Sequence, residues 1–352
     1  MTEVPTLLRR LLTAPGPSGY EEQASAVWRS EAESFAEVTG DALGSSVARV
    51  AGRSDGPLLA VVGHIDEIGL IVTHIDDDGF LFFAGIGGWD PTILVGQRVE
   101  VLTADGPIPG VIGKKPIHLL KQPEREKAAK ITDLHIDIAA SDGDDAAERV
   151  QIGDSAVIAA EPVELPHGRI TSRSLDNRLG AYVALEAARL VSAAGGSPGD
   201  IVAVAPVQEE ITLGGAQTTA YSLRPDLAIV VDVTFATDPP GTDEKELGRH
   251  KLGSGPVIGR GATIHPRVYE ALRDAAKAEE IEHTVAASAR GTSTDADAIH
   301  LSRAGVPTGV LSIPLRYMHS PVEMVQLSDV QACARLIAAV AQRLDASASF
   351  SR

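Results

Sequence analysis

The chain has 352 residues, more than a single hydrophobic core usually holds, so we expect one large domain and a smaller one. Its formal net charge of −17 argues against nucleic acid or an anionic membrane surface as a partner. The single cysteine, Cys333, excludes an internal disulfide framework and a cysteine-based zinc site. No stretch reaches the roughly 18 uninterrupted apolar residues of a membrane span, and MTEVPTLLRRLL lacks the basic start of a leader, so we expect a cytoplasmic protein.

The first part of the chain predicts helices and then a strand. Between residues 3 and 29, the spacing of leucines, alanines and valines predicts two short helices separated by the breaker string APGPSGY. The apolar run LLAVV then predicts a buried strand, and His64 and Asp66 follow it.

Residues 69–164 predict a small β-rich domain inserted into the chain. Short β-type runs (GLIVTHI, GFLFFAG, QRVEVLT, DLHIDIAA and DSAVIAA) alternate with turn strings such as DDDG and SDGDD. The charged segment KKPIHLLKQPEREKAAKI predicts an exposed loop with a helical piece.

Residues 165–352 alternate between strand and helix patterns, which is typical of an α/β domain. The runs IVAVAPV, LAIVVDV and TGVLSIP predict strands, and LDNRLGAYVALEAARLV predicts a helix. A closing helix is expected over SDVQACARLIAAVAQRL, with Ser328 and Gln331 as a capping box and Cys333 buried. We predict that residues 1–68 and 165–352 together form one α/β domain, interrupted by the insert.

Polar residues gather where the apolar runs end. They are His64, Asp66, Asp176, Glu209, Glu210, Asp232 and His319. Ligands collect at strand ends in α/β sheets, and a set of imidazoles and carboxylates without cysteine suits Zn, Co or Mn. Taken singly, a histidine or a glutamate pair at a strand end is more often an ordinary surface group. Their joint placement favours a site for two divalent cations.

The pair Glu209–Glu210 suggests two separate roles. Neighbouring residues of an extended chain point in opposite directions, so the two carboxylates share a site only if the backbone turns, and ITLGG is the expected turn. One glutamate can bind metal while the other takes a proton from water. A carboxylate that bound metal directly would be too strongly ionised to serve well as that base.

Five strings in order (GHIDEIGLIVTHI, SLDNRLG, VQEEITLGGA, VVDVTFATDPPG and GTSTDADAIHLSRAGVPTGVLSIPLRYMHSPVE) resemble the M42 family of dinuclear metallo-aminopeptidases, the tetrahedral (TET) or glutamyl aminopeptidase-like enzymes. The resemblance spans nearly the whole chain. It implies a three-layer α/β/α metallopeptidase domain of the phosphorylase/hydrolase-like kind with a PDZ-like insert for dimerisation or as a lid. It also implies homodimers that build a dodecamer, and two divalent ions per subunit, Zn or Co, with Mn also compatible.

Carried over by motif, the resemblance implies that Asp176 bridges two ions. It places Glu210 and His319 at one ion, and His64 and Asp232 at the other. It makes Glu209 the general base, and we interpret Asp66 as the carboxylate that orients the His64 imidazole. The implied reaction removes the N-terminal residue from peptides with a free N-terminus, through a water activated by two metals. Acidic, neutral and basic N-terminal residues are all compatible with the sequence.

Two other functions are consistent with parts of this pattern. An M20-type N-acyl amino-acid deacylase or carboxypeptidase uses a similar ligand set, but that family inserts its extra domain just before the last histidine ligand. Here the insert lies between His64 and Asp176, which favours M42. A catalytically silent assembly or binding protein is the third hypothesis, and the complete ligand set argues against it.

Overall fold

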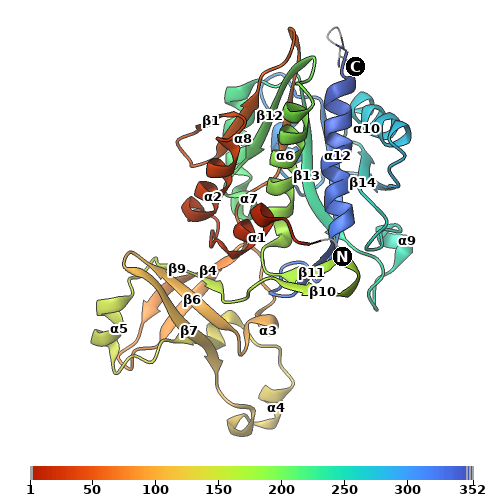
Figure 1. The fold of residues 1–352 in the computed structure, drawn as a ribbon. Coiled ribbons are helices and arrows are strands. Elements are labelled where there is room, and N and C mark those ends of the chain that lie inside the picture. The colour runs from red at the N-terminus through yellow and green to blue at the C-terminus, as the bar shows by residue number, and fades with distance from the viewer. Residues whose placement is uncertain (1–2, 346–347, 349, 351–352) are drawn as a thin grey trace.

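The computed structural model describes residues 3–345, 348 and 350, and consists of a mixed α/β body and a closed β-barrel (Figure 1). Within the described residues, the body contains an 11-stranded sheet. Its path is β1 (Glu37–Gly40), β2 (Ser46–Val50), β12 (Gly199–Ala205), β3 (Gly56–Val62), β13 (Leu227–Phe235), β16 (Thr308–Arg316), β17 (Glu323–Gln326), β11 (Arg169–Ser172) and β10 (Val163–Leu165). Strand β14 (Val257–Gly261) pairs with β16 and with β15 (Thr284–Ser288).

The centre of this sheet is parallel, which decides where the site forms. Strand β3 runs parallel to both β12 and β13, and β13 runs parallel to β16. These four strands correspond to the predicted apolar runs, and most of their residues are buried. Because parallel strands end at the same edge of a sheet, the polar residues that follow them arrive close together.

Helices pack on both faces of the sheet. Along β3, Leu59 and Val61 belong to one apolar cluster, while Ala60 and Val62 belong to another. The first cluster includes residues of α1 (Thr6–Thr13), α2 (Glu22–Ala32), α6 (Leu175–Ala193), α10 (Pro266–Ala278) and α12 (Leu327–Arg343). The second includes residues of α8 (Gly214–Leu223) and α11 (Ala296–Ile299). The alternation follows from the two-residue period of a strand.

The barrel projects from one end of the body (Figure 1). Its closed order is β4 (Gly69–Ile75), β5 (Leu81–Ile86), β8 (Leu134–Asp137), β7 (Gly106–Lys114), β6 (Arg98–Thr103) and β9 (Ser155–Ile158). These strands enclose an apolar cluster of their own. All six lie within the predicted insert, while the exact division at residues 69 and 164 stays a prediction.

The remaining elements are short. They are α3 (Pro91–Leu94), η1 (Ile117–Leu119), α4 (Gln122–Arg125), η2 (Ile131–Asp133), α5 (Gly143–Arg149), η3 (Pro166–Gly168), α7 (Glu209–Thr212) and α9 (Glu244–Leu247). Helices η1 and α4 lie in the charged segment expected to be an exposed loop with a helical piece, and that segment is largely exposed. None of the described helices combines the length and apolarity needed to cross a membrane.

The predicted capping box of the closing helix is wrong. Helix α12 begins at Leu327 with Gln326 as its N-cap, and no side chain caps it. Ser328 therefore already lies inside the first turn, where its hydroxyl is not at the capping position. Cys333 is buried in this helix, as expected.

Candidate metal centre

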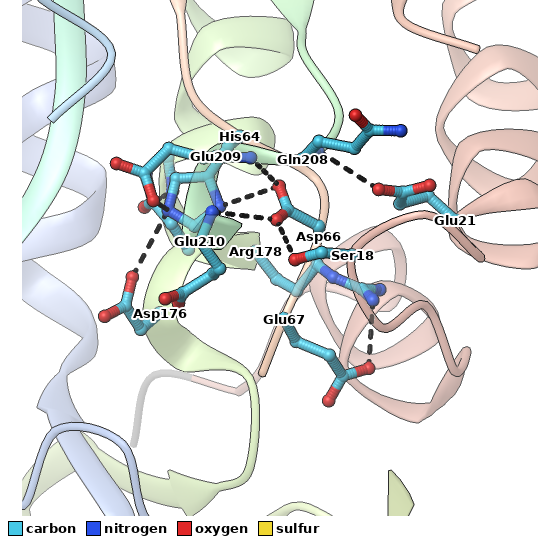
Figure 2. Close-up of polar contacts among 12 residues, drawn as sticks. Ser18, Glu21, His64, Asp66, Glu67, Asp176, Arg178, Gln208, Glu209 and Glu210 are labelled. Carbon is cyan, nitrogen blue, oxygen red and sulfur yellow. Dashed lines mark hydrogen bonds and ion pairs between the residues drawn. The ribbon is translucent and has the colours of Figure 1, made fainter. Parts of the chain in front are cut away.

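The predicted residues meet at the edge where the parallel strands end. His64 follows β3, Asp232 lies in the last part of β13, and His319 follows β16. The other three come from helix starts: Asp176 from α6, and Glu209 and Glu210 from α7, which follows β12. Figure 2 shows several of these side chains pointing toward one another. Segments far apart in the sequence thus contribute to one cluster.

Asp176 lies between the two histidines. Its Oδ1 is 3.4 Å from Nε2 of His64, and its Oδ2 is 3.4 Å from Nε2 of His319. The two oxygens of one carboxylate therefore face two different imidazoles. This is the placement expected of a carboxylate that bridges two cations.

The remaining carboxylates lie around the two histidines. Oε1 of Glu210 is 3.4 Å from Nε2 of His319, so these two candidate ligands lie next to each other. Ligand atoms of His64, Glu209 and Asp232 lie within 4.8 Å of one another, as do those of His64, Asp176 and Glu210. The geometry thus brings both Asp232 and Glu209 close to His64.

The glutamate pair is turned by the residue before it. Gln208 has φ 60° and ψ 32°, in the left-handed region, so the chain leaves β12 abruptly and Glu209 begins a helical turn. A turn at ITLGG also exists, because Leu213 is left-handed with φ 56°, but it follows the pair. The sharp change of direction that the two carboxylates require therefore occurs at Gln208, which the sequence analysis did not single out.

Asp66 links the His64 segment to this turn. The carboxylate is fully buried and accepts hydrogen bonds from the backbone N–H groups of Glu209 and Glu210, both at 3.1 Å. Its Oδ1 also lies 3.3 Å from Nδ1 of His64, without the alignment of a full hydrogen bond. Burial works to raise the pKa of Asp66, but its contacts with His64 and Ser18 outweigh this and hold that pKa below its usual value.

Burial, nearby acids and the two histidines shift the pKa values of the cluster. Burial, together with repulsion from Asp232 and Asp295, raises the pKa of Glu209 to about 9 despite the nearby His64. Burial also raises the pKa of Asp232 well above its usual value. Hydrogen bonds to His319 and His64 overcome burial at Asp176 and lower its pKa to about 2. Burial disfavours the charged form of a carboxyl group, and like charges at close range add to the upward shift.

The donor chemistry of this cluster fits divalent cations. It offers imidazole nitrogens and carboxylate oxygens in a mostly buried setting, with no thiolate among the grouped residues, which suits Zn, Co or Mn. A cation placed among the carboxylates would offset the repulsion that raises the pKa of Glu209 and Asp232. The described residues therefore include two sets of side chains able to hold a metal ion, and Asp176 is a member of one of them.

His319 is oriented by the barrel. Its Nδ1 lies 2.9 Å from the carbonyl oxygen of Gly88, in the loop between β5 and α3. Nδ1–H donates to that carbonyl when Nε2 carries the lone pair, so Nε2 faces Asp176 and Glu210 as a potential ligand. Trp89, the next residue, donates from its indole nitrogen to the Gly69 carbonyl at 2.7 Å, which ties the loop to β4.

Two buried acids beside the cluster, Glu323 and Asp295, were missed in the sequence analysis. Glu323 is buried and accepts from the backbone N–H of Asp176 at 3.0 Å and from that of His319 at 2.9 Å. Asp295 is also buried, and neither carboxylate oxygen has a hydrogen-bond partner in the described part of the chain. A cavity of about 20 Å³ reaches this region and is lined in part by Trp89, Asp176 and Glu323.

One signal in the sequence pointed to Glu323. It follows His319 by four residues in the string HSPVE, directly before MVQL. A glutamate is almost never fully buried without partners. Its partners are backbone groups distant in the chain, however, and a backbone N–H leaves no mark in a sequence.

Comparison with known proteins places this geometry in a family. A model of the M42 glutamyl aminopeptidase family matches residues 44–336. The lysyl aminopeptidase of Pyrococcus furiosus is 36% identical over 346 residues, which cover 96% of both sequences. This similarity extends over the sheet, the barrel and the candidate metal centre.

Solved structures agree with the family match. The TET aminopeptidase from the marine sediment archaeon Thaumarchaeota archaeon SCGC AB-539-E09 has a TM-score of 0.92 and 37% identity, and the match covers 96% of each chain. The TET1 peptidase of Pyrococcus horikoshii, which can assemble into a tetrahedron or a large octahedral shell, has a TM-score of 0.85 and 33% identity over 96% of this chain and 99% of its own. With its central parallel strands, its barrel and its cluster of acids and histidines, the chain belongs to the M42 family of aminopeptidases.

Proposed function

We propose that this protein is a metal-dependent aminopeptidase that removes N-terminal residues from peptides and uses two divalent cations. The observation that carries the proposal is the position of Asp176, whose two oxygens each face a different histidine. Glu209 lies beside this arrangement, with Oε2 3.7 Å from Nε2 of His64. A bridging carboxylate next to a further acid is the inventory that two-metal hydrolysis requires.

Two ligand sets share Asp176. We assign Glu210 and His319 to one cation, and His64 and Asp232 to the other. When bound, the cations would supply Lewis-acid polarisation of the scissile carbonyl and make a neighbouring water more acidic. Zn or Co, with Mn as a further candidate, suits these nitrogen and oxygen donors.

Glu209 is the general base in this proposal. Its side chain is 11% exposed, so a water molecule at the surface of the cluster lies within its reach. Burial raises the pKa of its carboxyl group to about 9, so the group would be protonated at neutral pH, and cations bound beside it would return it to the ionised form that accepts a proton. A base of this kind takes a proton from water and later delivers it to the leaving amine. Asp66 supports it by accepting from the backbone N–H of Glu209.

The M20-type deacylase or carboxypeptidase is not favoured. The family model matches across both the barrel and the sheet, and the barrel lies between His64 and Asp176 in the chain. The silent assembly protein is disfavoured because every proposed ligand and the base lie in one cluster. Cleavage of acetylated peptides in preference to free ones would nonetheless restore the deacylase hypothesis.

We also propose an assembled state. Residues 69–164 would form a PDZ-like dimerisation or lid domain, and residues 1–68 and 165–352 a three-layer α/β/α catalytic domain. Support comes from the TET1 peptidase, which can assemble into a tetrahedron or a large octahedral shell. Analytical ultracentrifugation would detect homodimers and a dodecamer, and a monomer at micromolar concentration would contradict this proposal.

One activity panel tests the proposed function. The protein, stripped of metal and reconstituted with Zn, Co or Mn, is assayed on Glu, Lys and Leu aminoacyl reporters and on a matched peptide with an acetylated N-terminus. The Glu and Lys reporters are included because the family model is described as glutamyl, whereas the Pyrococcus furiosus relative is a lysyl aminopeptidase. We expect metal-dependent cleavage of free N-termini only. If no reporter is cleaved with any of these metals, the proposed function is wrong.

A further inference from the structure

The loop between α1 and α2 reaches the candidate catalytic site. Its residues 14–21 precede the segment that the family model matches, which begins at residue 44. Ser18 N–H donates to the carbonyl of Glu67, and Glu67 N–H donates to the carbonyl of Gly16, both at 3.1 Å. The loop therefore pairs, in the manner of a short β-bridge, with the chain directly after Asp66.

Ser18 contacts the acid that holds the glutamate pair. Its hydroxyl donates to Oδ2 of Asp66 at 2.5 Å, and both groups are buried. Asp66 in turn accepts from the backbone N–H groups of Glu209 and Glu210. A continuous chain of hydrogen bonds thus runs from Ser18 to the backbone of the proposed general base (Figure 2).

Glu21 contacts the same turn from another direction. Its Oε1 accepts from Gly19 N–H at 2.6 Å and from Gln208 N–H at 3.1 Å, and the residue is only 5% exposed. Gln208 is the left-handed residue at which the chain changes direction into α7. The first four N–H groups of a helix lack partners within the helix, so external acceptors define how it starts. Here the acceptors are Glu21 and Asp66.

A buried arginine anchors the loop. The guanidinium of Arg178 is fully buried and donates to the carbonyls of Leu11 at 2.7 Å and Ala14 at 3.0 Å, and to Oε1 of Glu67 at 3.1 Å. A Cβ at Gly16 would lie 2.7 Å from this guanidinium, so the close approach requires glycine. The segment that carries Ser18 and Glu21 is therefore held against the body by several buried contacts.

We propose that Ser18 and Glu21 are positioning residues, which hold the Gln208–Glu210 turn so that the Glu209 carboxylate stays at the cluster. This inference rests on the proposed role of Glu209 as the base. Neither residue touches the reacting atoms. Each acts through a hydrogen bond: Ser18 through Asp66, and Glu21 through the backbone of Gln208. A small displacement of a catalytic group is costly in rate, whereas substrate binding elsewhere is unaffected.

The test uses Ser18→Ala, Glu21→Ala and Glu21→Gln in the metal-loaded protein. Glu21→Gln keeps an acceptor oxygen for Gln208 N–H, so it serves as the conservative rescue. Ser25→Ala is the control for Ser18, because Ser25 is also buried but its hydroxyl has no hydrogen-bond partner within the described residues. Glu22→Ala is the control for Glu21, because Glu22 is the adjacent exposed glutamate.

Two readouts decide the outcome. We expect Ser18→Ala and Glu21→Ala to lower kcat by about 10- to 100-fold, the range typical of residues that orient a metal site, with KM nearly unchanged. Glu21→Gln and both controls should retain most of kcat. Hydrogen–deuterium exchange, which needs no activity, should speed up at the Gln208 amide in Glu21→Ala and at the Glu209 and Glu210 amides in Ser18→Ala. Metal content and melting temperature confirm that each variant is folded and loaded.

Several results would overturn the inference. They are unchanged exchange at these amides, a raised KM at constant kcat, or a Glu21→Gln variant as impaired as Glu21→Ala. The exchange data also separate this inference from the proposed function. If the unaltered protein cleaves no reporter but the exchange contrast appears, the aminopeptidase proposal fails while the positioning contacts stand. If it cleaves reporters and the contrast is absent, the positioning inference alone fails.

Discussion

The two halves of the cluster are built differently. His64 is 2% exposed at its side chain, and its Nδ1 faces Asp66, two residues further along the same segment of the body. His319 is 33% exposed, and its Nδ1 faces a backbone carbonyl of the barrel, 231 residues away in the chain. His64 is therefore held by the core of the sheet, whereas the position of His319 depends on the barrel loop that contacts it.

This difference has a consequence for the two proposed cation sites. Core packing and buried hydrogen bonds around His64 resist local change, because interiors are close-packed. His319, by contrast, is partly exposed, and its Nδ1 contact is with a backbone carbonyl in a loop of the barrel. We therefore expect the His64 site to be rigid and the His319 site to be the more easily weakened. Asp176 belongs to both.

Removing the shared carboxylate should have the largest effect. Asp176→Ala is expected to lose activity and both cations, because each histidine loses the oxygen that faces it. Enzyme assays and elemental analysis of the purified variant provide the measurement. Asp55→Ala, at an exposed aspartate, serves as the control. Two metals retained per chain in Asp176→Ala would contradict the bridging role.

The next largest effect is expected at the base. Glu209→Gln should keep its fold and its metals but lower kcat by about 10²- to 10⁴-fold, the usual contribution of general acid–base catalysis. Elemental analysis, melting temperature and steady-state kinetics test this together. A near-normal kcat would remove Glu209 from the mechanism and shift attention to the other carboxylates.

Replacing each histidine compares the two halves directly. In metal-free protein, His64→Ala should destabilise the fold by on the order of 3 kcal/mol, because it leaves buried carboxylates without their cationic partner. His319→Ala should cost only about 1 kcal/mol, since a partly exposed group is readily solvated. Urea unfolding of the two variants measures the difference. Equal losses would show that the two halves do not differ in rigidity.

A glycine in the barrel loop tests the proposed His319 site separately from the His64 site. Gly87 has φ +74°, and a Cβ there would lie 2.6 Å from Cγ2 of Ile68. Gly87→Ala should displace the neighbouring Gly88 carbonyl and weaken metal binding at the His319 site by about 10-fold, as loss of an orienting partner does. Gly96→Ala is the matched control, because Gly96 has φ +81° and open space around it. Calorimetric titration with Zn should show one weakened site in Gly87→Ala and none in the control.

The smallest expected effect is a change in stability with pH, caused by Glu21 in the loop between α1 and α2. Burial raises the pKa of Glu21 from 4.5 to about 7. Between these values the folded protein binds more protons than the unfolded chain, so stability falls as pH rises from about 4.5 to 7. Glu21→Gln removes this contribution. The difference in melting temperature, variant minus unaltered protein, should therefore be larger at pH 8 than at pH 4.5. A difference that is constant with pH would contradict the assignment.

Particular elements show which features of the fold could be predicted. Continuous β-branched runs such as LLAVV and LAIVVDV identified the central strands, because only strands buried on both faces are apolar throughout. The alternating short runs of residues 69–164 identified a β-rich insert, although not its closure into a barrel. The capping box at Ser328 failed because helix α12 starts at Leu327, and boundaries depend on packing at the first turn.

The sequence by itself determined which residue types stand at the strand ends, and with them the chemistry: His64, Asp176, Glu210, Asp232 and His319 as nitrogen and oxygen donors, with Glu209 beside them. Only the tertiary structure decided what holds them in place. Gly88 orients His319 through a backbone carbonyl, Gln208 turns the chain with its backbone, and Ser18 reaches Asp66 across 48 positions. Such contacts leave no pattern in the sequence, because every residue carries the same carbonyl and nearly every one the same N–H, so only folding selects which of them meet.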